Sequence, residues 1–273
     1  MSKPILHHYT SGAGVLGIIE SDSIWATRIQ YMNDAKEFLH AIEIAEQHLK
    51  KIGHESDDDL RKKFCEAVSD NLNRADKLTI YVACFSEIDD SLSQWRGYCP
   101  PSFGYSLGFD GDKLEALVKN QGFILKPCIY ESVEQGNIVK RWVEKAVEYL
   151  IARYRDSEDF TEYCRKQSGH ILETFIQFAP FLKHSSFQDE REWRLVSVIP
   201  TDDSRTELRP GKSTLVPYVK VKLGLSSDQT PLWNLRVGPT PHKDLAMNAI
   251  TVMFNKVRFR NGIAASETPY RDW

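Results

Sequence analysis

The sequence lacks the features that mark several common classes of protein. Its five cysteines are widely scattered and form no Cys-x-x-Cys pair, so we expect reduced, buried thiols and no structural zinc site. No apolar run is long enough to cross a bilayer, and residues 1–4 lead directly into an expected strand rather than a signal peptide. We therefore expect a cytoplasmic protein with no membrane partner.

The sequence has no large excess of positive or of negative charge. The formal net charge is -3 and the sequence pI is about 6.3, which excludes a global attraction to nucleic acid or to anionic lipid. The chain has no internal repeat, no Gly-rich phosphate loop, no serine elbow and no His-Glu-x-x-His motif. The protein classes that depend on those motifs are therefore excluded.

Hydrophobic periodicity predicts strands and helices that are intermixed along the 273 residues. The strands are not separated by regular crossover helices, which argues against a Rossmann-type sheet and for an α+β fold. We expect a single domain of residues 1–273 with helical insertions at about 37–76 and 131–181. The expected strands are residues 5–11, 24–28, 78–86, 103–109, 123–130, 215–223 and 232–237, together with a strand in the segment 187–200 that carries Glu190, Glu192 and Arg194.

The segment 187–200 is the most informative stretch, because its second half alternates like a strand. Alternation would place Glu190, Glu192 and Arg194 on one face, with Arg191 and Trp193 on the other. Closely spaced carboxylates perturb one another's pKa, and such perturbation clusters at functional sites. The structural alternative is a solvated strand end in which an arginine pairs with a glutamate.

Two other clusters have both a functional and a structural interpretation. Asn33 and Asp34 could line a site, but either one could also cap the helix that follows, with Glu37 at capping-box distance from Asp34. Trp95 and Tyr98 could form a stacking wall for a planar ligand. Trp95 could equally be a core anchor under a loop.

Five motifs follow one another along the chain: His8-Tyr9-Thr10-Ser11, Asn33-Asp34 with Glu37, Cys84-Phe85-Ser86, Gln94-Trp95-Arg96-Gly97-Tyr98, and Phe187 with Glu190-x-Glu192-x-Arg194. Taken in this order, they resemble the bacterial family known as domain of unknown function 2971, and the resemblance covers nearly the whole chain. More distantly, the chain is similar to the ADP-ribosyltransferase superfamily.

The wider resemblance implies a mixed, largely antiparallel split sheet that binds NAD as substrate in its cleft. His8 matches the first position of the superfamily's site, Ser86 or Tyr98 the second, and Glu190 with Glu192 the third. Glu192 is then the catalytic carboxylate, because it is the second of the pair. The motif at the second position differs from the Ser-Thr-Ser motif of the superfamily. The superfamily's tyrosine could correspond to Tyr9, Tyr31 or Tyr98.

The implied reaction breaks the bond between nicotinamide and ribose through an oxocarbenium-like transition state, which a fixed carboxylate stabilises. Glu192 would supply that carboxylate, Glu190 would orient the acceptor, and His8 would donate to a ribose hydroxyl. The acceptor stays open among protein, nucleic acid, small molecule and water, and the resemblance suggests a toxin or anti-phage effector. The residues expected to bind the NAD-like nucleotide are Tyr9, Thr10, Arg28, Asn33, Asp34, Ser86, Gln94, Trp95, Tyr98 and Arg194.

We expect Glu192→Gln to leave the fold intact and to lose two or more orders of magnitude in rate. Two rival hypotheses stay open. In the first, Asp34, Glu190 and Glu192 hold magnesium in a nuclease, with help from Lys183. In the second, the same cleft binds a nucleotide without catalysis.

Overall fold

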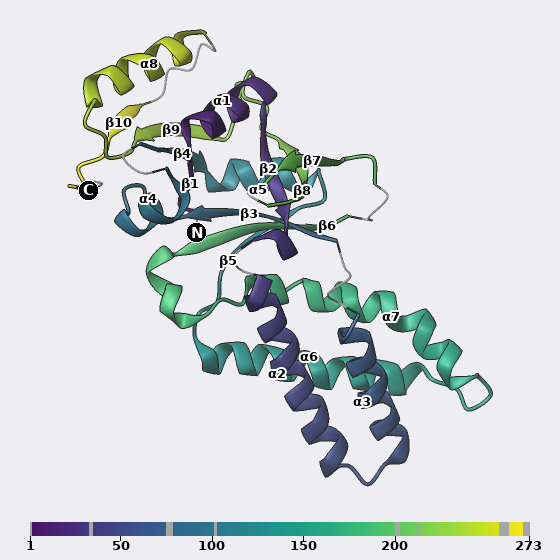
Figure 1. The fold of residues 1–273 in the computed structure, drawn as a ribbon. Coiled ribbons are helices and arrows are strands. Elements are labelled where there is room, and N and C mark those ends of the chain that lie inside the picture. The colour runs from purple at the N-terminus through teal and green to yellow at the C-terminus, as the bar shows by residue number, and fades with distance from the viewer. Residues whose placement is uncertain are drawn as a thin grey trace. The chain divides into compact units, whose positions relative to one another are not determined.

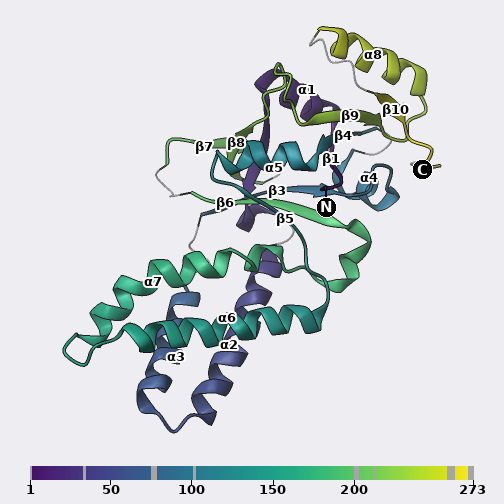
Figure 2. The ribbon, with the colours of Figure 1, turned by 180° about the vertical axis from the view of Figure 1, so that it is seen from behind.

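The computed structural model describes residues 2–32, 35–74, 79–100, 103–199, 203–211, 213–256 and 262–269. The chain forms two compact units, each built from segments that are distant in the sequence (Figures 1 and 2). We call Met1–Arg28, Tyr81–Pro127 and Gln188–Trp273 the sheet unit, and Ile29–Ile80 with Cys128–Phe187 the helical unit. The helical unit contains both ranges that the sequence marked as insertions.

The sheet unit is built on a mixed, mostly antiparallel open sheet, so the α+β class is confirmed. The hydrogen-bonded order is β10-β9-β4-β1-β3-β2-β8-β7, and β6 pairs with both β3 and β5. β10 runs parallel to β9. The strands are β1 Ile5–Thr10, β2 Ser23–Arg28, β3 Ile80–Ser86, β4 Tyr105–Asp110, β5 Ile124–Pro127, β6 Glu192–Val198, β7 Thr206–Pro210, β8 Leu215–Lys222, β9 Leu232–Val237 and β10 Ile263–Ala265.

One face of this sheet carries the apolar core. Side chains alternate between faces along each strand, and Leu6, Phe85 and Leu195 all point to the core side. Helices α1 Gly12–Ser21, α5 Gly111–Lys119 and α8 Lys243–Lys256 also contribute side chains to this core. Ser11 is the N-cap of α1 and accepts a hydrogen bond from the Gly14 amide at 3.1 Å. The short helix α4, Leu92–Tyr98, follows β3.

The helical unit packs long amphipathic helices around an aromatic core. The ring of Phe64 contacts those of Tyr154, Phe160 and Tyr163, and the ring of Trp142 contacts Phe175. These aromatic side chains therefore form part of the core of the helical unit. The elements are η1 Ile29–Tyr31, α2 Ala35–Glu55, α3 Asp59–Leu72, α6 Ser132–Arg153, α7 Phe160–Ile176 and η3 Ala179–Phe181. Across the described residues, no helix is long and apolar enough to span a membrane.

The placement of Glu190 on the strand was wrong. Glu190 ends the 3-10 helix η4 Ser185–Glu190, and β6 begins only at Glu192. Between them Arg191 adopts a left-handed backbone with φ 42, which interrupts the strand alternation. The strands β7 and β10 were not predicted. Asn33 and Asp34 lie outside the described residues, and so does the side chain of Glu37.

Candidate functional site

Five residues line up across five neighbouring strands of the sheet unit. His7 is paired with Gly108 on one side and with Ser86 on the other, and Gly108 is paired with Asn234. On the far side of β3, the Glu87 amide donates to the Arg191 carbonyl at 3.1 Å. Glu87 follows the last residue of β3, and Arg191 precedes the first residue of β6. The two strands can therefore lie side by side from this hydrogen bond onward only if they are antiparallel. In that arrangement Ser86 is opposite Glu192. We call Asn234, Gly108, His7, Ser86 and Glu192 the cross-strand row.

The cross-strand row lies on the face opposite to the apolar core. The chain neighbours Leu6, Phe85 and Trp193 all belong to that core, and so do Leu107 and Leu235. Because successive strand side chains point to opposite faces, the row residues must point the other way. Neighbouring residues of the row are about 5 Å apart at Cα, so the row brings an imidazole and a carboxylate to one surface from distant parts of the chain.

His7 is a buried and neutral imidazole. It is 5% exposed, and burial lowers its pKa to about 4, with Arg236 lowering it further and Asp89 opposing the shift. Its Nδ1 lies 3.4 Å from the Ser106 hydroxyl. At neutral pH the ring can therefore donate one hydrogen bond and accept another.

Glu192 is held by an arginine on its own strand. Arg194 donates from Nε to Oε1 of Glu192 at 2.9 Å and from Nη2 to Oε2 at 3.3 Å. The two side chains are 4% and 1% exposed, so this is a buried ion pair with two hydrogen bonds. The pair fixes the position of the Glu192 carboxylate on the face of the row, and Arg194 compensates its charge. It also engages the Arg194 guanidinium with Glu192, whereas the sequence analysis expected Arg194 to bind the nucleotide.

Ser86 connects β3 to the segment before β6. Its hydroxyl donates to the Glu190 carbonyl at 2.7 Å and accepts from the Ile88 amide at 3.0 Å. The side chain thus fixes the backbone at the start of β6, directly beside Glu192.

The other end of the row has unused hydrogen-bonding capacity. Within the described part of the chain, Asn234 Oδ1 and Arg236 Nε are buried without a hydrogen-bond partner. Arg236 otherwise pairs with Asp89 at 2.6 Å and donates to the Ala265 carbonyl at 2.9 Å. Gly108 makes room for this arrangement, because a Cβ there would lie 2.0 Å from Asn234 Oδ1 and 3.0 Å from His7 Cε1. Buried polar atoms normally have partners, so these two atoms are exceptions among the described residues.

His8 lies on the core face of the sheet, as the alternation with Leu6 requires. Its Nδ1 is 2.9 Å from the Cys84 carbonyl and its ring is 5.7 Å from that of Phe85. Burial lowers its pKa, and the hydrogen bond to Cys84 opposes that shift. His8 and Glu192 are therefore not on the same face, whereas His7 and Glu192 are. Thr10 shares the face of His8.

The tryptophan of α4 is a packing residue. Trp95 is 2% exposed and donates to Asp90 at 2.8 Å, while Tyr9 meets it edge-on at 4.5 Å between ring centroids. A Cβ at Gly238 would lie 3.0 Å from the indole, so the backbone of Gly238 also packs closely against it. The structure thus agrees with the alternative in which Trp95 anchors a loop.

The remaining candidate residues are dispersed. Tyr9 shares the face of the row, but its hydroxyl donates to the Ile88 carbonyl and accepts from the Ser91 amide. Gln94 is buried, and Tyr98 is 42% exposed. Arg28 ends β2 opposite Tyr81.

Sequence reasoning preferred His8 to His7, and it missed Asn234 and Arg236. Alternation along β1 puts His7 on the face opposite to Leu6 and His8, but only the folded sheet shows which of the two faces carries the core. Among the residues described, no group of three or more His, Cys, Asp or Glu side chains is placed to hold a metal ion.

Comparison with known proteins gives one match. Residues 94–195, less than half of the chain, match the model of a family described as "Protein of unknown function (DUF2971)". No curated protein and no solved structure matches the chain. The matched range runs from Gln94 to Leu195 and includes two of the motifs that carry the resemblance to this family. The similarity to domain of unknown function 2971 is thereby supported over residues 94–195.

Proposed function

We propose that the sheet unit binds an NAD-like nucleotide across the cross-strand row and cleaves the bond between nicotinamide and ribose. The observation that carries the proposal is the unused Oδ1 of Asn234 and Nε of Arg236 beside a neutral, buried His7, on the same face as Glu192. An acceptor and a donor without partners suit the amide and phosphate groups of such a nucleotide. The resemblance to the ADP-ribosyltransferase superfamily adds to this.

The division of the sheet at β3 is a second support. The last residue of β3, Ser86, pairs with β1, whereas Tyr81 and Val82 near the start of β3 pair with β2. The strand β6 is a third neighbour of β3. β3 is thus the strand at which a split of the sheet would occur.

The residues of the row take the roles that their chemistry allows. Glu192 would stabilise the positive charge that develops on the ribose, and Arg194 keeps that carboxylate ionised and oriented. His7, in place of His8, would bind a ribose hydroxyl. Glu190, whose carbonyl is tied to Ser86, would stand beside the acceptor. Water as acceptor would make the protein an NAD glycohydrolase, and a side chain or base would make it a transferase.

The biological role that suits such a reaction is that of a toxin or anti-phage effector. Release of nicotinamide consumes NAD irreversibly when water is the acceptor, and a transferred ADP-ribose inactivates its target. Expression of the wild-type chain should then lower cellular NAD or label a cell component.

The decisive experiment uses Asn234, because its Oδ1 has no hydrogen-bond partner among the described residues. Asn234→Leu should therefore preserve stability while removing an acceptor from the site. We expect the wild type to bind NAD and release nicotinamide, Asn234→Leu to lose at least tenfold in both affinity and rate, and the exposed control Asn255→Leu on α8 to keep both. Wild-type protein that neither binds NAD nor releases nicotinamide would refute the proposal, as would full activity in Asn234→Leu.

A second candidate is a nucleotide sensor without catalysis. The ion pair between Glu192 and Arg194 favours the sensor. A carboxylate that is already paired with a guanidinium is less available to stabilise the positive charge that develops on the ribose. Tight NAD binding with no nicotinamide release would support the sensor. Activity that chelator abolishes and magnesium restores would instead favour the nuclease hypothesis.

A further inference from the structure

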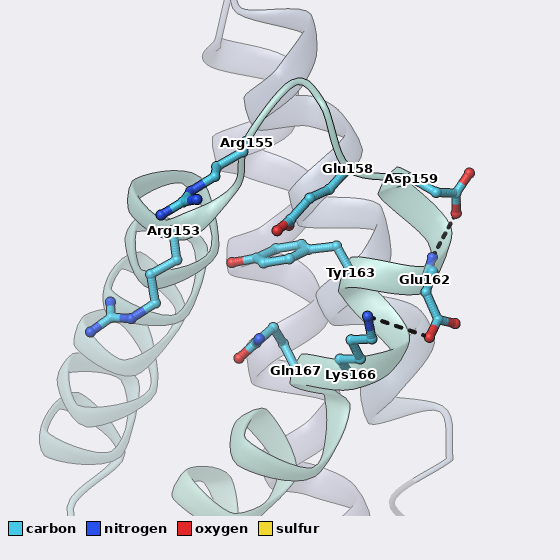
Figure 3. A pocket seen from close by; sticks show the side chains of 8 residues that line it. All are labelled: Arg153, Arg155, Glu158, Asp159, Glu162, Tyr163, Lys166 and Gln167. Atoms are coloured by element: carbon cyan, nitrogen blue, oxygen red, sulfur yellow. Dashed lines mark hydrogen bonds and ion pairs between the residues drawn. The ribbon is translucent and has the colours of Figure 1, made fainter.

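A hollow of about 590 Å³ lies in the helical unit, where α6 ends and α7 begins (Figure 3). This volume is within the range of small-molecule sites. Arg153 and Arg155 lie at one end of it, and Glu158, Tyr163 and Gln167 face them from the following loop and α7. The hollow belongs to a different unit from the cross-strand row, so it is independent of the function proposed above.

The two arginines supply unneutralised positive charge. The guanidinium carbon of Arg153 lies 4.0 Å from the centre of the Tyr149 ring, and that ring also packs on His170 at 4.5 Å. In the part of the chain that the structure describes, neither Arg153 nor Arg155 has a carboxylate partner. Arg153 thus has a defined position while its N–H groups stay available.

The acidic side chains of the hollow are mostly engaged elsewhere. Glu162 accepts two hydrogen bonds from Arg165 at 2.8 Å and pairs with Lys166 at 3.7 Å. The hydrogen bond to Arg165 is the main reason that the pKa of Glu162 falls to about 2. Asp159 accepts from the Glu162 amide as the N-cap of α7. In Figure 3 both carboxylates point away from the arginines, and Glu158 is the acid that remains near them.

Gln167 adds a neutral donor to the arginine end. Its Oε1 accepts from the Tyr149 hydroxyl at 3.2 Å, which leaves the amide hydrogens free to donate. Arginines at such a position ordinarily stabilise the C-terminus of a helix, because their positive charge interacts favourably with the helix dipole. This role accounts for Arg153, the last residue of α6, but Arg155 lies beyond the helix and faces the same hollow.

We propose that this hollow binds a small phosphorylated molecule that also carries an amine or hydroxyl group. Arg153, Arg155 and Gln167 would donate to the phosphoryl oxygens, because guanidinium groups bind phosphate bidentately. Glu158 would accept a hydrogen bond from the amine or hydroxyl group beside the phosphate.

The test is calorimetric titration of the full chain, at low ionic strength, with phosphoethanolamine, inorganic phosphate and malonate. We expect phosphoethanolamine to bind more tightly than inorganic phosphate, and malonate to bind most weakly. Arg153→Gln and Arg155→Gln should each weaken phosphoethanolamine binding about tenfold. Arg141→Gln is the matched control, since Arg141 is an exposed arginine of α6 that, among the described residues, donates only to the Asn137 carbonyl.

Glu158→Gln separates recognition of the amine from recognition of the phosphate. It should remove the preference for phosphoethanolamine and leave inorganic phosphate bound at least as tightly as before, because a nearby negative charge is gone. Equal loss in Arg155→Gln and Arg141→Gln would overturn the proposal. So would malonate binding as tight as that of phosphoethanolamine, or the absence of phosphoethanolamine binding to the folded wild type.

Discussion

The buried pair of Glu192 and Arg194 makes the sharpest prediction about the sheet unit. Its side chains are 4% and 1% exposed and share hydrogen bonds of 2.9 and 3.3 Å. Removing one partner leaves an uncompensated buried charge, which costs about 3–5 kcal/mol. Glu192→Gln and Arg194→Met should therefore each lower the free energy of unfolding by about that amount. The sequence-based expectation that Glu192→Gln leaves the fold intact is replaced by this one.

The double variant distinguishes the pair from ordinary packing. Replacing both partners by uncharged side chains of similar volume leaves no uncompensated buried charge, and such replacements are often close to neutral. Glu192→Gln with Arg194→Met should therefore lose much less than the sum of the two single changes, with a coupling of about 3 kcal/mol.

The measurement is urea unfolding of the four proteins, followed by tryptophan fluorescence and by circular dichroism. Glu207→Gln is a useful control, because it breaks a comparable but more exposed pair with Lys220 at 2.8 Å. That control should lose less than about 1 kcal/mol. A loss below 1 kcal/mol in Glu192→Gln, or strict additivity in the double variant, would refute the reasoning. Any activity measured on Glu192 variants must then be normalised to the folded fraction.

Three further predictions follow from the same unit. His7 has a folded pKa of about 4 against an ordinary 6.5, so stability is complete above pH 6.5 and falls by up to about 3 kcal/mol as the pH drops towards 4. His7→Asn should flatten that pH dependence in unfolding experiments, and an unchanged slope would contradict the assignment. Gly108→Ala puts a Cβ 2.0 Å from Asn234 Oδ1, so we expect a loss of about 1–3 kcal/mol in the unfolding free energy and weaker NAD binding. Arg191→Gly relieves a left-handed residue and should raise stability by up to about 1 kcal/mol, whereas Arg191→Ala should not.

Local sequence patterns were sufficient for most helices and strands of this protein. Ser11 and Asp58 cap their helices with side-chain hydrogen bonds, and the buried strand β3 follows from its run of apolar residues. Such signals act within a few residues, so they can be read directly from the sequence. β7 escaped prediction because it alternates only weakly and lies at the edge of the sheet.

The errors at the candidate site have a different origin. Glu190 has the same sequence parity as Glu192, but Arg191 turns the backbone between them, and alternation cannot reveal a residue with positive φ. The faces of His7 and His8 depend on which neighbour enters the core, and Leu6 settles that question only once the sheet is known.

The sequence by itself therefore determined the α+β class, the extent of most elements and the presence of paired charges near position 192. Only the tertiary structure decided that Asn234, Gly108, His7, Ser86 and Glu192 share one face, because the strands that bring them together are joined by hydrogen bonds between distant segments. It also decided that Glu192 and Arg194 are buried, since burial depends on what covers a strand and not on the strand's own pattern.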